Sequence, residues 1–249
     1  MKKLGELTTE EVASLVASPP SCVLFPVGSV EPHGPHLPLS TDTLISEAAC
    51  ARAADLLEAH GVQVALAPSL PYGVTDYAAG FKGAIGVPAA ALEAMLHAIV
   101  LRLLADGFSH VCLVNNHLEP AHDQAVRASI AGFSAGQASV ACPLTRKWAR
   151  TLSDEFKRGN CHAGRYETSL VMAAGGAVRP EFAALASSDI SLADGIKAGK
   201  ATFRDMGITR AYTGAPAEAT ADEGRALYEK LAEMIVGEVT VALGLAAGT

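Results

Sequence analysis

The chain has 249 residues, half of them apolar, a length and composition that suit one α/β domain over residues 1–249 with a single large core. Its formal net charge of −7 is spread along the sequence without a basic run, which argues against nucleic acid or an anionic membrane surface as a partner. Charged residues interrupt the longest apolar stretches, and no apolar segment follows the two lysines near the N-terminus. We therefore expect neither a membrane span nor a secretion signal.

The cysteines indicate where in the cell the protein is expected. There are five, an odd number, and they are widely spaced and lie mostly in apolar runs. This pattern is typical of reduced thiols in a core and not of a disulfide framework, so we expect a cytoplasmic protein.

Local signals predict alternating helices and strands. Thr8 and Glu11 have the spacing of a capping box, which predicts a short first helix, and the apolar run 21–27 predicts the first buried strand. The later predicted elements are a helix over 43–60, a strand over 62–67, a helix over 88–106, a strand over 110–114, a helix over 120–133, a strand over 138–142, a helix over 166–174 and a last helix after Thr220. Repeated units of this length predict an α/β fold with three α/β/α layers around a mostly parallel central sheet.

Three segments lack a regular pattern. Segment 71–86 is rich in glycine and carries three aromatic residues, which suits a substrate-facing loop and an ordinary surface crossover about equally. Segment 147–159 is polar and predicted to be less regular than the elements before it, and segment 187–210 is predicted to be irregular. The second of them is a candidate cover for a site or a subunit contact.

Two pairs of metal-binding residue types follow the first and third predicted strands. Glu31 and His33 form the first pair, and His117 and Glu119 form the second. Residues two apart on extended backbone point to the same side, so each pair can converge on one point, at the strand ends where α/β folds keep their chemistry. With Asp42 they make five ligands, too many for one tetrahedral zinc but suited to two adjacent ions that share a carboxylate.

Each of these residues also has a structural explanation. A single histidine at a strand end often only completes hydrogen bonds, a loop carboxylate is usually solvated, and Asp42 could cap the helix that follows it. The residues around the two clusters favour function, because turn-forming types are crowded beside plain apolar strands. They are Gly34, Pro35 and Pro38 in the first cluster and Asn115, Asn116 and Pro120 in the second.

Three motifs resemble those of a known family. The stretch 28–38, closed by Thr41 and Asp42, resembles the signature of the creatininase (creatinine amidohydrolase) family. Segment 115–119 resembles the second metal motif of that family, and His162, with 163–169 after it, resembles the third. The motifs occur in the family's order, and the similarity runs from about residue 5 to the last helix.

The resemblance implies a site and an assembly. It implies a di-metal amidohydrolase in which Asp42 bridges two ions, with His162 in the catalytic and substrate-binding position, and it suggests a homohexamer. The implied metal ligands are Glu31, His33, Asp42, His117 and Glu119.

The chain also departs from the family pattern at positions that bear on substrate. Leu118 stands where creatininase has an aromatic residue, and Arg158 with Gly159 stand in place of a Trp-Asp pair, whereas Thr75 keeps a small hydroxyl. These departures remove the flat surface and the carboxylate that a guanidinium-like ring needs. We therefore expect a neutral or anionic small molecule instead of creatinine, with Thr75, Leu118 and Arg158 as candidate substrate contacts.

Three further residues have less certain roles. Glu167 falls in the first turn of a predicted helix, where it could orient a metal ligand, take a proton, or only stabilise the helix dipole. His36 is three residues from His33, so we expect it to contact a ligand residue or the substrate and not an ion. His122 is predicted to lie on the surface of its helix.

The function predicted from these residues is hydrolysis of a C–N amide bond in a small, possibly cyclic, substrate. Water activated between two divalent ions would attack the carbonyl, and His162 would stabilise the oxyanion or protonate the leaving nitrogen. The nitrogen and oxygen ligands suit zinc or manganese, and also iron. Two alternatives remain: an isomerase or ring-opening hydrolase acting on a carbohydrate-like or carbocyclic ketone, and a scaffold that only binds metal.

Overall fold

The computed structural model describes residues 1–245, and its centre is a parallel sheet with the strand order β1-β3-β2-β4-β5. Every hydrogen-bonded pair of neighbouring strands is parallel. The strands are β1 (Lys2–Lys3), β2 (Ser21–Val27), β3 (Gln63–Leu66), β4 (His110–Asn115) and β5 (Ala138–Ala141). The predicted α/β fold with a parallel sheet is confirmed.

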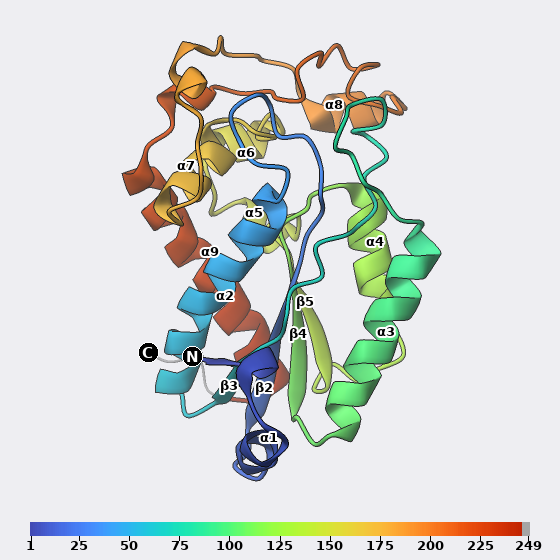
Figure 1. The fold of residues 1–249 in the computed structure, drawn as a ribbon, viewed down its shortest axis with the longest axis vertical. Coiled ribbons are helices and arrows are strands. Elements are labelled where there is room, and N and C mark those ends of the chain that lie inside the picture. The colour runs from blue at the N-terminus through green and yellow to red at the C-terminus, as the bar shows by residue number, and fades with distance from the viewer. Residues whose placement is uncertain (246–249) are drawn as a thin grey trace.

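Helices cover both faces of this sheet. In Figure 1, α2 and α9 lie on one side of the strands, and α3 and α4 lie on the other. The longer helices are α1 (Thr9–Val16), α2 (Thr41–Ala59), α3 (Ala89–Ala105), α4 (Pro120–Ser129), α7 (Arg165–Ala173) and α9 (Ala221–Ala242). The short helices α5 (Arg146–Ala149), α6 (Asp154–Arg158) and α8 (Leu192–Lys197) lie toward the upper end of the view in Figure 1.

The alternation of side chains along the buried strands builds two cores. Leu24 faces the core formed with α2, α7 and α9, whereas its neighbours Val23 and Phe25 face the core formed with α1, α3 and α4. Because both faces of the strands are covered, β2 is apolar or small at every position and fully buried.

Most predicted elements are present, with shifts at their ends. The strand over 21–27 is confirmed as predicted, and the capping box of Thr8 and Glu11 is present at the start of α1. Helix α2 begins at Thr41 and has Ser40 at its N-cap, so Asp42 lies in the first turn and is not the cap. The segments 147–159 and 187–210 are interrupted by the short helices α5, α6 and α8, which the sequence did not predict because they are too short to show a periodic pattern.

The strand order places the ends of β2 and β4 side by side. The chain leaves β2 through α2 to reach β3 on one side, and it reaches β4 on the other side through α3. Val27 at the end of β2 is paired with Asn115 at the end of β4, so the two loops that follow start together. This is the switch point of the sheet, where open α/β folds bind their ligands.

Two expectations about the whole chain can be compared with the structure. Among residues 1–245, no helix combines the length and the apolar character that crossing a membrane requires. All five cysteines lie in that part of the chain, buried and outside any disulfide.

The contribution of the sheet core can be measured at Leu24, which is fully buried between β2 and the α2 and α9 layer. We expect Leu24→Ala to lower the free energy of unfolding by about 2–5 kcal/mol, because the substitution leaves a cavity. Urea denaturation of the variant and the wild type measures the difference. Leu56→Ala is the matched control: Leu56 is 40% exposed, so we expect a change within about 0.5 kcal/mol. Equal effects in the two variants would contradict the described packing.

Candidate metal centre

Residues from separate parts of the chain meet at the carboxyl ends of β2 and β4. Glu31 and His33 lie in the loop after β2, and His117 lies in the loop after β4. Asp42 and Glu167 come from the first turns of α2 and α7. All of these side chains are buried, so the sheet, two loops and two helix N-termini position one cluster of ionisable groups.

Asp42 stands at the middle of the cluster. Its Oδ1 lies 3.1 Å from Nε2 of His33, and its Oδ2 lies 3.0 Å from Nδ1 of His117. Each carboxylate oxygen therefore faces a different imidazole. Two groups that could each hold an ion share this aspartate: Glu31, Asp42 and His117 form one, and His33, Asp42 and Glu167 form the other, with the ligand atoms of each within 4.8 Å of one another.

Backbone carbonyl groups fix the orientation of the histidine rings. A carbonyl oxygen only accepts, so His33 donates from Nδ1 to the Glu31 carbonyl at 3.0 Å, and His117 donates from Nε2 to the Val74 carbonyl at 2.6 Å. In a neutral ring the other nitrogen then has no proton. That nitrogen points at the carboxylates in both residues, which is the arrangement of a metal-binding histidine.

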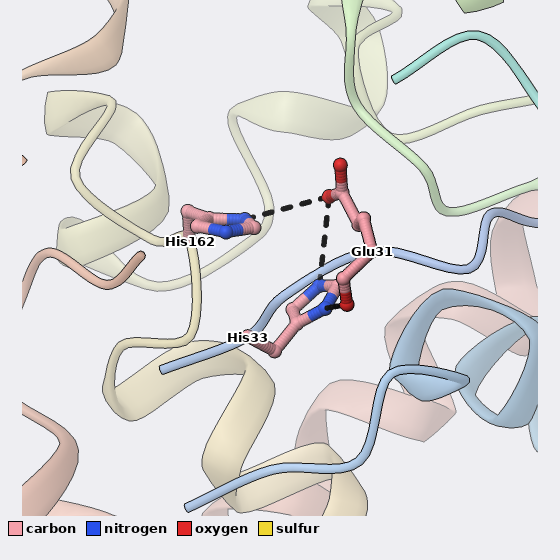
Figure 2. Close-up of side chains that lie close together, drawn as sticks. All are labelled: Glu31, His33 and His162. Atoms are coloured by element: carbon pink, nitrogen blue, oxygen red, sulfur yellow. Dashed lines mark hydrogen bonds and ion pairs between the residues drawn. The ribbon is translucent and has the colours of Figure 1, made fainter. Parts of the chain in front are cut away.

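Glu31 connects the two sides of the cluster. Figure 2 shows its carboxylate facing the rings of both His33 and His162, and Oε1 lies 3.8 Å from a nitrogen of each. The same oxygen lies 3.4 Å from Nδ1 of His117, and Oε2 accepts a hydrogen bond from the hydroxyl of Thr75. Glu31, together with His33 and His162, forms a third group that could hold an ion.

The donor set fits divalent cations. His33 Nε2 and Asp42 Oδ2 are buried without a hydrogen-bond partner, which is costly unless a cation contacts them. Burial alone lowers the pKa of His33, yet Asp42 and Glu167 outweigh it and raise that pKa to about 10. The carboxylates thus hold a negative potential that favours positive charge between them.

Glu167 belongs to this cluster. Its Oε2 lies 3.5 Å from Nε2 of His33 and accepts a hydrogen bond of 2.6 Å from the backbone N–H of Ala163. Burial raises the pKa of Glu167 to about 8, although His33 acts in the opposite direction. The first-turn position predicted for Glu167 is confirmed, and the side chain points at the other carboxylates.

Glu119 is held differently from the other carboxylates. It is the N-cap residue of α4, and it accepts hydrogen bonds from the backbone N–H groups of Asp76 at 3.0 Å and Tyr77 at 3.2 Å. It lines the cavity beside the cluster but joins none of the three possible ion-binding groups among the described residues. Burial raises the pKa of Glu119 to about 7, and His117 lowers it in part.

His162 reaches the cluster from the loop between α6 and α7. Its Nε2 donates to the Pro32 carbonyl at 3.1 Å, so Nδ1 of the neutral ring faces Glu31 without a proton. Burial and the neighbouring His33 lower the pKa of His162 to about 4. The ring also lines the cavity.

The predicted substrate contacts are dispersed. Leu118 lines the cavity beside the cluster, whereas Thr75 is buried behind Glu31. His36 is buried away from the cavity, and its Nε2 is hydrogen-bonded to the Thr168 hydroxyl at 2.8 Å. Arg158 is exposed at the end of α6 and lines a separate surface hollow, while its neighbours Lys157 and Gly159 line the cavity.

The expectation that His122 lies on the surface was wrong. It is fully buried, its ring packs edge-on against His117 at 4.6 Å, and its Nδ1 accepts from the Val74 N–H at 3.2 Å. Val74 is therefore held on both sides, since its carbonyl accepts from His117. The position of His122 near the start of its helix did not reveal this role, because its partner is the backbone of a distant loop.

Glu155 is a second buried residue that the sequence did not indicate. Its carboxylate accepts hydrogen bonds from the backbone N–H groups of Arg165 and Tyr166, the first two residues of α7, and of Ala215. The N-cap Gly164 provides no side chain, and a Cβ at that position would lie 2.8 Å from the Glu155 carboxylate. Glu155 in α6 thus caps the helix that carries Glu167.

The cluster forms the floor of a cavity of about 220 Å³. Glu31, Asp42, His117, Glu119, His162 and Glu167 line it at one end. Carboxylates and imidazoles that converge on one open cavity can bind cations, activate water and move protons.

Comparison with known proteins gives one family over nearly the whole chain. The creatininase family model, described as creatinine amidohydrolase, matches residues 5–239. A mycofactocin precursor peptide peptidase of Mycobacterium ulcerans (strain Agy99) is 30% identical over 258 residues, which cover 95% of this chain and 91% of that protein. The creatinine amidohydrolase of Pseudomonas putida is 30% identical over 121 residues, 47% of this chain and 45% of that protein.

Solved creatininase structures share the fold. A crystal structure of creatinine amidohydrolase matches with a TM-score of 0.74 at 19% identity over 98% of both chains. A manganese form of creatininase gives a TM-score of 0.71 at 20% identity, covering 96% of this chain and 98% of the other. A mutant creatininase of zinc-zinc type gives 0.68 at 18% identity, covering 98% and 99%.

The capping role of Glu155 predicts that removing its carboxylate destabilises the fold. We expect Glu155→Ala to lower the free energy of unfolding by about 2–4 kcal/mol, because several buried N–H groups lose a charged acceptor. Urea denaturation measures this difference. Asp154→Ala is the control, since Asp154 precedes Glu155 in α6 and its side chain is exposed. A variant at Glu155 as stable as this control would show that α7 does not need the cap.

Proposed function

The chain belongs to the creatininase family of metal-dependent hydrolases, and we propose that it is a di-metal amidohydrolase that cleaves a C–N amide bond of a small substrate. The observation that carries this proposal is the position of Asp42, which presents one oxygen to each of two potential ion-binding groups. A carboxylate shared in this way is typical of sites that hold two adjacent ions.

The geometry supports a ligand set that differs from the one implied by the sequence. We assign Glu31, Asp42 and His117 to one ion and His33, Asp42 and Glu167 to the other. We do not assign Glu119 as a metal ligand, because two backbone N–H groups hold its carboxylate beside the cluster. Zinc and manganese are the metals we propose, since the donors are nitrogen and oxygen atoms and solved creatininases include manganese and zinc-zinc forms.

Bound ions supply Lewis acidity and lower the pKa of a bound water. The residues of this chain then position substrate and move protons. Glu119 faces the cavity with a carboxylate free of the ion groups, so it is placed to take a proton from the attacking water and pass it to the leaving nitrogen. Neutral His162 offers an unprotonated Nδ1, which can accept a hydrogen bond from the substrate.

The named relatives favour hydrolysis over the isomerase alternative. One is named as a peptide peptidase and the other as an amidohydrolase, and both names describe hydrolysis of a bond between carbonyl carbon and nitrogen. The amide that we propose here can therefore belong to a short peptide or to another small molecule. Creatinine is disfavoured, because Gly159 lines the cavity where the family pattern has a carboxylate, and a guanidinium-like ring then lacks its charged partner.

The first test is the metal content of the protein. We expect two divalent ions per chain after loading with zinc or manganese, and at most one in Asp42→Asn, because the shared ligand is weakened at both ions. Elemental analysis by mass spectrometry measures the ions, with Asp55→Asn on the exposed side of α2 as the control. Two ions retained in Asp42→Asn would contradict its shared role.

A screen of small amides and short peptides tests the reaction itself. We expect it to detect a released amine and carboxylate, whereas isomeric products would support the isomerase.

A pair of matched substitutions tests the two glutamates. We expect Glu167→Gln to lose one ion, and Glu119→Gln to keep both ions while turnover falls about 10²–10⁴-fold, the usual contribution of a general base. Metal content and turnover of the amide found in the screen are measured for both variants. Loss of an ion in Glu119→Gln but not in Glu167→Gln would restore Glu119 as the ligand.

A further inference from the structure

We propose that the substrate carries an uncharged apolar group, about the size of a phenyl ring or a leucine side chain, next to the amide that is cleaved. This inference rests on the proposed function, because it concerns the cavity that the metal centre opens into. It deepens that function by naming the chemical class of the substrate.

The part of the cavity beyond the ionisable cluster is apolar. Leu118 comes from the loop after β4, Leu192 and Ile196 come from α8, and Phe203 and Met206 follow α8 in the chain. Leu192 and Ile196 are four residues apart, so they lie on one face of the short helix. We call Leu118, Leu192, Ile196, Phe203 and Met206 the apolar wall.

The apolar wall begins at the reacting centre. The ring of Phe203 lies 4.6 Å from the ring of His162, which itself faces Glu31. A group held against the wall is therefore next to the bond that the metal centre and His162 would act on.

Contacts behind the wall hold it in place. Phe203 is 4% exposed, stacks on Tyr77 with ring centres 6.2 Å apart, and donates its N–H to the Tyr77 carbonyl at 2.7 Å. Ile208 is buried in the same small cluster and donates its N–H to the Phe203 carbonyl at 2.8 Å. Because these contacts are made by the protein's own residues, the packing of Phe203 does not depend on a substrate, and little ordering cost is expected on binding.

Charge in the cavity argues against a charged substituent. Among the described residues that line it, Lys157 is the one charged side chain outside the ionisable cluster. Its ammonium lies 3.1 Å from the Asp154 carboxylate, so it already has a partner. A charged substituent would lose its hydration against the wall without gaining an unpaired counter-charge.

The volume fits a group of moderate size. The cavity holds about 220 Å³, whereas a cavity of about 150 Å³ lined by leucine, isoleucine and phenylalanine is sufficient for benzene. A phenyl ring or a branched alkyl group therefore fits together with the amide. Two such groups exceed the space.

Hydroxamic acids test this inference without a known substrate. The hydroxamate group that they share chelates the ions, and the substituent of each compound enters the space beside the metal centre. We compare acetohydroxamic acid, phenylacetohydroxamic acid and succinic monohydroxamic acid by calorimetric titration of the metal-loaded full chain. We expect the phenyl compound to bind at least about tenfold tighter than the methyl compound, from the burial of its ring, and the succinic compound to gain nothing.

A charge placed in the wall should reverse this preference. In Ile196→Lys we expect the phenyl compound to lose about tenfold in affinity and the succinic compound to become the tighter ligand. Ile196 is half-buried on a short helix, so the lysine can be tolerated by the fold. Leu101→Lys is the matched control, because Leu101 is 53% exposed in α3 and does not line the cavity.

The outcomes separate this inference from the proposed function. If acetohydroxamic acid binds but the phenyl compound binds no tighter, or if the succinic compound binds best to the wild type, the apolar wall does not select the substrate and the inference is overturned. If acetohydroxamic acid does not bind the metal-loaded protein at all, the di-metal proposal fails first.

Discussion

Burial of several carboxylates in one small space is the constraint on which the rest of the structure depends. Glu31, Asp42, Glu119 and Glu167 all lie beneath the surface at the end of the sheet, and buried negative charge is costly without compensation. Part of the compensation comes from the backbone. Asp42 and Glu167 lie in the first turns of α2 and α7, and Glu119 is the N-cap of α4, so three helix N-termini bring partial positive charge to the cluster. We infer that bound cations supply the rest of the compensation for this buried negative charge.

The sequence predicts the strands and the residues that follow them better than it predicts the buried contacts around the cluster. Strands β2 and β4 are strongly apolar, so their ends and the residues that follow could be located. Glu119 keeps the extended backbone that the sequence suggested, but the N–H groups of Asp76 and Tyr77 bind its carboxylate, and our proposal therefore gives it a role in proton transfer. His122 and Glu155 could not be predicted, because their partners are backbone groups of other segments. The partner of His122 is 48 residues away along the chain, and those of Glu155 are 10, 11 and 60 residues away.

The chemistry and the choice of substrate are built by different parts of the chain. The metal centre comes from the ends of β2 and β4 and from two helix N-termini, all fixed by the sheet and its cores. Four of the five residues of the apolar wall come from segment 188–214. This segment shares a small core with residues 77–84, and its ends are held by two hydrogen bonds of 2.8 Å between Ser188 and Gly214. Substitutions at the wall positions can therefore change the group that the cavity accepts, while the residues of the cluster stay the same. Such a division is consistent with relatives of similar sequence that are named for different substrates.

Glu155 joins these two parts. Its carboxylate accepts from the first N–H groups of α7, which positions Glu167, and from Ala215, directly after the segment that carries the wall. Thr213 in that segment also donates its N–H to the His162 carbonyl at 2.9 Å. The loop with His162, the helix with Glu167 and the base of the wall segment are thus connected through one buried side chain and a few backbone bonds. A shift of the wall segment has a short path to the metal centre, so the position of a bound apolar group and the geometry of the catalytic residues are physically coupled.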